Sequence, residues 1–219
     1  HIMEGYYETG IGWLCNPQSQ ASSHFVVSKK GEITQLVDIR ESAWVNGTST
    51  DSKKNNHYSK SSLKLVRDRK TNANYYTIGI EHEGFSSQGQ GKLTPEQFKA
   101  TVWLHKYIIA EVKKIYGIDI PVDREHIVGH YQIDPIRKPN CPGKAFQWDD
   151  LIKELKDGGN VSTSKNNNIV KATYKGKQFN FDGFMKDNSN YVQIRQVLEA
   201  LGYRIDWDNR TKTVLIYDK

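Results

Sequence analysis

The sequence predicts a mixed α/β protein in two parts. Residues 1–157 are expected to combine strands with helices, and residues 169–219 to form a small C-terminal α+β domain. Three observations lead to this prediction: strand-like runs alternate with an amphipathic helix in the first part, a small polar segment follows, and helix and strand patterns resume after it. A length of 219 residues suits one ordinary domain with a small companion.

Three segments rich in β-branched and aromatic residues predict strands, at residues 22–27, 32–37 and 75–82. The Lys29-Lys30-Gly31 run between the first two predicts a hairpin turn.

Two helices are predicted in the first part. The run Thr94-Pro95-Glu96-Gln97 is a strong helix start, with a Thr cap and Pro at the first helical position. Apolar residues at helical spacing carry this helix to about Tyr116, where Gly117 ends it. A second helix is expected from Trp148 to Leu155.

Residues 158–168 (GGNVSTSKNNN) are small and polar, which is typical of a flexible linker. After them we expect a helix at Tyr191–Leu201, a turn at Trp207–Asn209 and a strand at Thr213–Tyr217. This tail of about 50 residues is near the lower limit for a self-sufficient core.

The composition narrows the class of protein only partly. The 31 basic and 25 acidic residues give a net charge of +6, which suits an anionic polymer without choosing among nucleic acid, teichoic acid and an acidic membrane. The two cysteines, Cys15 and Cys141, are too few for a disulfide framework, although they could form one bridge. No apolar run approaches the roughly 20 residues that span a bilayer, and no signal-peptide pattern is present.

One loop carries the clearest chemical signal. His130 and Cys141 lie eleven residues apart in a proline-rich segment, and imidazole and thiolate are ligands that zinc prefers. The alternatives are a hydrogen-bonded structural histidine and a small buried thiol. Arg137 and Lys138 between them are either solvated loop cations or groups that stabilise a developing oxyanion.

A carboxylate in the third predicted strand is a second candidate. Because strand side chains alternate, Ile78, Ile80 and His82 share one face and Glu81 points from the other. The isoleucine face should pack under the long helix. Glu81 is then either a general base or a solvated carboxylate near the strand end.

Other histidines are given no metal. His24 lies within a predicted strand and suits the core or a groove lining, His82 faces the core, His105 lies on the long helix and His57 in a polar loop. Trp44 suits either a groove wall or the core.

Several strings occur together in a characteristic order: Ser22-Ser23-His24-Phe25-Val26-Val27, Ala43-Trp44, Thr77-Ile78-Gly79-Ile80-Glu81, Gly129-His130 and Cys141-Pro142-Gly143. Through them, roughly residues 1–157 resemble the type 2, zinc-dependent N-acetylmuramoyl-L-alanine amidases, relatives of peptidoglycan recognition proteins and phage lysozyme-type amidases. The resemblance implies a central sheet flanked by helices, with Zn²⁺ in a surface groove.

Matched residue by residue, the resemblance implies that His1, His130 and Cys141 are the zinc ligands and that Glu81 is the catalytic carboxylate. It implies a catalytic cation at Lys138, which stands three residues before the third ligand where the family has two, and Arg137 is the alternative.

The assignment of His1 rests on the start of the chain. Endolysins of this branch read Val-Ile-His-Ile-Met-x-Gly where this chain reads His1-Ile2-Met3-Glu4-Gly5. We therefore expect a domain cut at its first ligand, with that ligand on an untethered end and a central strand missing from the sheet.

The tail has its own resemblance. The strings Tyr191-Val192-Gln193-Ile194-Arg195, Leu198-Glu199-Ala200-Leu201-Gly202, Trp207-Asp208 and Thr211-Lys212-Thr213-Val214 resemble the copper amine oxidase amino-terminal (stalk) domain. Residues 169–219 contain no histidine or cysteine, so copper chemistry is not expected. The resemblance implies wall binding, with anionic wall polymers as candidate partners, or a spacer.

Together these resemblances imply a bacteriolytic hydrolase that degrades the cell wall, cleaving peptidoglycan between N-acetylmuramic acid and L-alanine with zinc-activated water. An endolysin or autolysin would have this layout, either phage-encoded in the cytosol and released at lysis, or secreted. The alternative is a non-catalytic peptidoglycan-binding module. We expect neither nucleic-acid binding nor membrane insertion.

Overall fold

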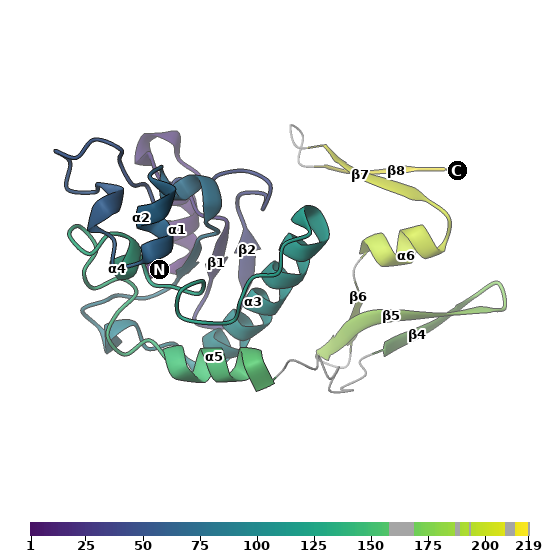
Figure 1. Cartoon of the computed structure of the whole chain (residues 1–219). Coiled ribbons are helices and arrows are strands. Elements are labelled where there is room, and N and C mark those ends of the chain that lie inside the picture. The colour runs from purple at the N-terminus through teal and green to yellow at the C-terminus, as the bar shows by residue number, and fades with distance from the viewer. Residues whose placement is uncertain (158–168, 187–188, 193, 209–212, 219) are drawn as a thin grey trace. The chain divides into compact units, whose positions relative to one another are not determined.

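The computed structural model describes residues 1–157, 169–186, 189–192, 194–208 and 213–218 (Figure 1). The chain divides into two compact units, His1–Gly158 and Gly159–Lys219. The first unit combines a mixed sheet with helices, and the second combines antiparallel sheets with one helix. The predicted α/β class is confirmed.

A small sheet with the strand order β2-β1-β3 lies at the centre of the first unit. Strand β1 (Phe25–Val27) pairs antiparallel with β2 (Ile33–Gln35) and parallel with β3 (Ile80–His82). The predicted hairpin between β1 and β2 is confirmed, and its turn places Gly31 at φ 86°, a conformation that favours glycine.

The strands are shorter than predicted. Residues 75–77 were expected to be part of β3, but Ala73–Tyr76 forms the 3₁₀ helix η3 instead. The Asn72 side chain explains this difference, because it accepts a hydrogen bond from the Asn74 backbone N–H and caps the helical turn.

The first residues of the chain run along the free edge of β3. The backbone nitrogen of His1 donates to the Ile80 carbonyl at 2.9 Å, and Met3 N–H donates to the His82 carbonyl at 3.0 Å. Ile2 therefore forms a parallel bridge with His82. The expectation that His1 sits on an untethered end is wrong, because these backbone hydrogen bonds fasten it to the sheet.

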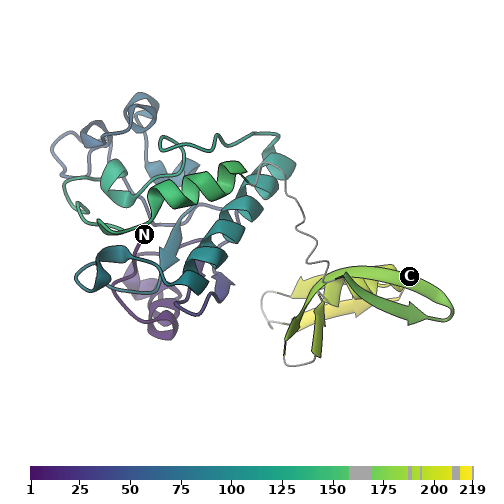
Figure 2. The same ribbon diagram turned by 90° about the horizontal axis from the view of Figure 1, so that it is seen from below.

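The helices surround this sheet (Figures 1 and 2). They are α1 (Tyr7–Leu14), α2 (Lys64–Arg69), α3 (Pro95–Tyr116), α4 (His130–Ile133) and α5 (Trp148–Asp157), with the 3₁₀ turns η1 (Pro17–Ser19), η2 (Tyr58–Lys60), η3 and η4 (Gly89–Gly91). The two predicted helices, α3 and α5, are confirmed. Thr94 caps α3 by accepting from Gln97 N–H, and Gly117 ends it in the left-handed conformation. Helix α1 was not predicted: it has no side-chain cap and buries none of its residues.

Three apolar clusters hold the unit together, and the smallest of them is formed by Leu63, Val66, Ala73 and Ile133. The sheet packs under α3 through Phe25, Val27, Ile39, Ile80, Leu104, Ile108 and Val112. Helix α5 lies against α3 (Figure 2) and buries Leu93, Ile127, Phe146, Leu151 and Leu155. Full burial of one such leucine stabilises the fold by about 1.5–3 kcal/mol. The predicted contact between the isoleucine face of β3 and the long helix is confirmed by Ile80.

The second unit begins with an antiparallel sheet of β4 (Ile169–Tyr174), β5 (Lys177–Lys186) and β6 (Ser189–Val192). Helix α6 (Ile194–Ala200) follows, and then β7 (Arg204–Asp208) pairs with β8 (Thr213–Tyr217).

The predictions for this tail were partly wrong. The predicted helix begins later than Tyr191, which lies in β6. Trp207 and Asp208, predicted in a turn, belong to β7, while Asn209 and the predicted linker at 158–168 lie outside the described residues. The strand at Thr213–Tyr217 is confirmed.

Within the described part of the chain, none of the helices has the length and apolar character that crossing a membrane requires.

Candidate metal centre

Three side chains distant in sequence meet at one point of the first unit. His1 lies on the edge of β3, His130 is the first residue of α4, and Cys141 lies in the loop between α4 and α5. One ligating atom from each lies within 4.8 Å of the other two. Cys141 Sγ is 3.7 Å from His1 Nδ1, and the two imidazole rings meet edge to face with centroids 4.4 Å apart.

The chemistry of this donor set fits a zinc ion. His130 is buried, and its Nε2 has no hydrogen-bond partner among the described residues. Burial, with the nearby charges of His1 and Lys138, lowers the pKa of His130 to about 2, so the ring is neutral and able to ligate. A buried, unpartnered nitrogen beside a thiol is a combination that a soft cation satisfies. Both cysteines are free, which excludes the disulfide alternative in this structure.

His82 and Thr101 hold the backbone of His1 in place through a chain of hydrogen bonds. The ring of His82 bonds the His1 carbonyl through Nδ1 at 2.8 Å and the Thr101 hydroxyl through Nε2 at 3.0 Å. Burial acts to lower the pKa of His1, but the neighbouring Glu81 carboxylate and Cys141 outweigh it, so this pKa is raised.

Asn46 is a neighbour of His1 that sequence reasoning missed. Its Nδ2 donates to Thr77 Oγ1 at 3.0 Å, while its buried Oδ1 makes no hydrogen bond within the described structure. The amide also acts to raise the pKa of His1. A polar residue in a loop carries no sequence pattern that would have identified it, apart from its closeness to the Ala43-Trp44 string.

Glu81 faces the cluster from β3. Its Oε1 lies 3.7 Å from His1 Nδ1, and its side chain is 14% exposed. Burial raises the pKa of this carboxyl, although the charges of His1 and Lys138 act in the opposite direction. Because the Oε2 atom is buried and has no partner among the described residues, the solvated alternative for Glu81 is wrong.

The two candidate cations have different surroundings. The Arg137 guanidinium donates to Asp134 Oδ2 at 2.5 Å and to the Gly47 carbonyl at 3.0 Å, so it fastens the loop. Lys138 is exposed and forms no ion pair with a described residue, and its charge acts on both Glu81 and His130. Of the two, Lys138 is the cation without an ion-pair partner among the described residues.

The other histidines discussed in the sequence analysis, and Trp44, are not members of the cluster formed by His1, His130 and Cys141. His24 is a core residue whose Nδ1 accepts from Gly79 N–H and whose Nε2 bonds the Glu41 carbonyl. His57 caps η2, and His105 bonds the Thr101 carbonyl. Trp44 is 62% exposed, so the core alternative for it is wrong.

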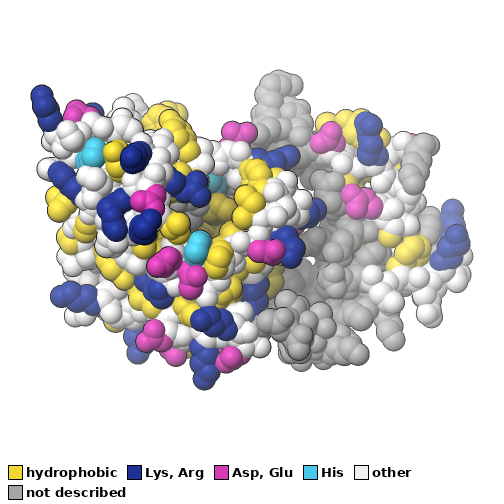
Figure 3. Space-filling model, viewed as in Figure 1, with side chains coloured by type: hydrophobic (Ala, Val, Ile, Leu, Met, Phe, Trp, Pro, Cys, Tyr) yellow, Lys and Arg dark blue, Asp and Glu magenta, His cyan; other side chains and the backbone are white. Residues whose placement is uncertain are grey.

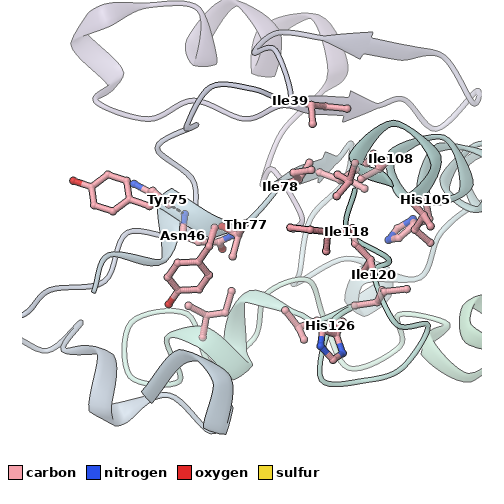
Figure 4. Close-up of a pocket in the computed structure, with 18 of the residues that line it drawn as sticks. Ile39, Asn46, Tyr75, Thr77, Ile78, His105, Ile108, Ile118, Ile120 and His126 are labelled. Carbon is pink, nitrogen blue, oxygen red and sulfur yellow. Dashed lines mark hydrogen bonds between the residues drawn. The ribbon is translucent and has the colours of Figure 1, made fainter. Parts of the chain in front are cut away.

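A cavity of about 710 Å³ adjoins the cluster and includes His1 in its wall. Its lining mixes aliphatic, aromatic and polar side chains. Figure 4 shows Ile39, Ile78, Ile108, Ile118 and Ile120 gathered around it beside His105 and His126, with Asn46, Thr77 and Tyr75 at one side. On the molecular surface, hydrophobic side chains surround a hollow on the face seen in Figure 3. The candidate centre therefore borders an apolar hollow as well as polar groups.

The order of these residues along the chain matches a known family. The family model of N-acetylmuramoyl-L-alanine amidases matches residues 1–144, which is well over half of the chain. The chain belongs to this amidase family. A second model, the copper amine oxidase N-terminal domain, matches residues 169–219 of the amidase.

Individual relatives of this chain are also named as amidases. N-acetylmuramoyl-L-alanine amidase A of Achromobacter lyticus is 29% identical over 170 residues, covering 73% of this amidase and 82% of the relative. The 1,6-anhydro-N-acetylmuramyl-L-alanine amidase AmpD of Haemophilus influenzae is 28% identical over 139 residues, covering 64% of this chain and 61% of the relative. A crystal structure of an AmpD derivative superposes with a TM-score of 0.42 at 24% identity, covering 62% of this chain and 60% of that chain.

Proposed function

We propose that the amidase hydrolyses peptidoglycan at the amide bond between N-acetylmuramic acid and L-alanine, and that Zn²⁺ held by His1, His130 and Cys141 assists the reaction. The observation that carries the proposal is the meeting of three ligating atoms within 4.8 Å of one another beside a buried carboxylate. The names of the relatives support the substrate class.

The role of each side chain follows from its place. Bound zinc would supply a Lewis acid that polarises the scissile carbonyl and makes water more acidic. Glu81 takes the proton of the attacking water at its unpartnered Oε2 and later delivers it to the leaving amine. Its raised pKa suits this double role, since a carboxyl nearer neutrality both accepts and returns a proton. The Lys138 ammonium stabilises the negative charge on the carbonyl oxygen.

His82 and Asn46 act on His1 rather than on the substrate. His82 fixes the His1 backbone from one side, and Asn46, anchored by Thr77, lies beside the imidazole. Polar partners of this kind hold a metal ligand in place, and their removal typically changes metal affinity 10–100-fold.

The proposal also assigns a role to each part of the chain. Residues 1–157 form the catalytic domain, residues 158–168 link it to the tail, and residues 169–219 bind anionic wall polymers or act as a spacer. The match of the tail to a separate family model supports this division. The substrate places the enzyme at the bacterial cell wall, either after release from a lysing cell or after secretion.

Metal content tests the assignment of the centre. We expect one zinc per chain after dialysis against zinc and removal of the excess, measured by elemental mass spectrometry. Cys141→Ser and His130→Ala should lose this zinc. Cys15→Ser, which changes the other cysteine, an exposed one, should retain it. Full zinc in both ligand variants would refute the assignment.

A further inference from the structure

Two glycines meet backbone to backbone next to the candidate ligand Cys141. Gly91 has φ 80° and Gly143 φ 132°, both in the region that side chains rarely adopt. A Cβ on Gly91 would lie 2.1 Å from the Pro142 carbonyl oxygen, and a Cβ on Gly143 would lie 2.1 Å from the Gln90 carbonyl oxygen. Both positions therefore require glycine for two independent reasons.

Hydrogen bonds continue this contact along both segments. Ala145 N–H donates to the Gln90 carbonyl at 2.9 Å. The Gln147 side chain accepts from Leu93 N–H at 2.9 Å and donates to the Leu93 carbonyl at 3.3 Å. We call residues 90–93 and 142–147 together the glycine seam.

The glycine seam connects the segment that carries Cys141 to the sheet edge that carries His1 and Glu81. Residues 90–93 belong to the loop that follows β3, and this loop is also fastened to the start of the chain through paired backbone hydrogen bonds between Gly84 and Gly5. Residues 142–147 begin directly after Cys141. The seam therefore joins the segment that carries the thiol to the edge of the sheet that carries His1 and Glu81.

We propose that Gly91, Gly143 and Gln147 are positioning residues that set the place of Cys141 Sγ relative to His1 and Glu81. This inference rests on the proposed zinc centre. A Cβ at either glycine would lie 2.1 Å from a carbonyl oxygen, which is more than 1 Å closer than the 3.4 Å at which ordinary contact begins. Because that oxygen belongs to the backbone, it cannot rotate away as a side chain could. The 142–147 segment must then shift, whereas metal–ligand distances tolerate only about 0.2 Å.

Cobalt binding by the full chain tests the seam independently of catalysis. Co²⁺ replaces zinc as the probe, because its visible and thiolate charge-transfer bands report ligand geometry. We expect Gly143→Ala to bind Co²⁺ at least tenfold more weakly and to shift the charge-transfer band. The matched control is Gly89→Ala in the same loop, which also has positive φ (69°) but has nothing within 4 Å of its Cβ position, and it should bind as the wild type does.

A milder variant covers the case in which Gly143→Ala does not fold. Gln147→Leu keeps the side-chain size and removes only the two hydrogen bonds to Leu93, so we expect a several-fold loss of Co²⁺ affinity. Circular dichroism of each metal-free variant establishes that it is folded. Folded seam variants with wild-type affinity and spectrum would overturn the inference alone. Failure of the wild type to bind Co²⁺ or Zn²⁺ would overturn the zinc centre and this inference with it.

Discussion

Glu81 Oε1 lies 3.7 Å from Nδ1 of His1, although one residue lies in strand β3 and the other at the start of the chain. The pairing of residues 1–3 with β3 produces this approach, because it places His1 beside the strand position that carries Glu81. A candidate ligand and a candidate base are thereby fixed by the same backbone hydrogen bonds. Metal binding and proton transfer should be separable by mutation of one or the other.

Glu81→Gln should retain zinc and lose activity. The amide has the same shape as the carboxyl but cannot take the proton of water, and loss of a general base typically costs 10²–10⁴-fold in rate. Glu83→Gln, two residues along the same segment, is the control, because Glu83 bonds the backbone of Lys29 instead. Turnover and zinc content are measured together. Wild-type turnover in Glu81→Gln would remove Glu81 from the mechanism.

Lys138→Gln should lower kcat by about 10²–10³-fold and leave zinc content unchanged, because it removes the charge that stabilises the oxyanion. Lys144→Gln, an exposed lysine three residues beyond Cys141, should retain full activity. Arg137→Gln should instead lower stability, since its guanidinium bonds Asp134 and Gly47. The assignment of Lys138 is refuted if its variant keeps kcat while Arg137→Gln loses it without unfolding.

His24 should make folding stability sensitive to acid. Burial lowers the pKa of His24 in the folded state, so below the ordinary value of about 6.5 the unfolded chain binds a proton that the folded chain does not. The stability contributed by His24 is therefore complete above that pH and is lost as the pH falls. Between pH 7 and pH 5 this loss amounts to at most about 2 kcal/mol.

His24→Gln isolates that contribution, because a glutamine amide also offers one donor and one acceptor to Glu41 and Gly79. Urea unfolding at pH 7 and pH 5 is the measurement. The wild type should lose more stability than His24→Gln between the two values. Equal losses would show that His24 is protonated in the folded protein.

Removal of residues 160–219 should spare the cleavage of soluble muropeptide and weaken the lysis of whole walls. The first unit has its own core, so it should fold without the tail. Rates on both substrates, compared between the full chain and the truncated form, provide the test. Equal lysis of whole walls by the two forms would exclude a targeting role for the tail.

Sequence reasoning succeeded where a local signal coincided with a packing requirement. The Thr94 cap and Gly117 stop delimit α3 as predicted, and the alternation around Ile80 correctly separated the core face from Glu81. It failed where a side chain redirected the backbone locally, as Asn72 does at η3. It also failed at Trp207, which looked like part of a turn and lies in β7, because strand pairing with β8 outweighs local turn preference.

The candidate centre was harder to predict than the elements. His130 and Cys141 lie eleven residues apart and could be proposed from their spacing, whereas His1 lies more than a hundred residues away and was assigned through family resemblance. Asn46 and the seam glycines carry no spacing signal at all. Their importance appears only when distant backbone segments come together, which a single sequence does not encode in any local pattern.

Product analysis tests the central claim most directly. Purified bacterial peptidoglycan is digested with and without a chelator, and new L-alanine amino termini and new reducing sugar ends are counted. The account predicts new alanine termini without new reducing ends, abolished by the chelator and restored by zinc. Retention of the protein on the wall with no new termini would contradict it and indicate a non-catalytic peptidoglycan-binding module.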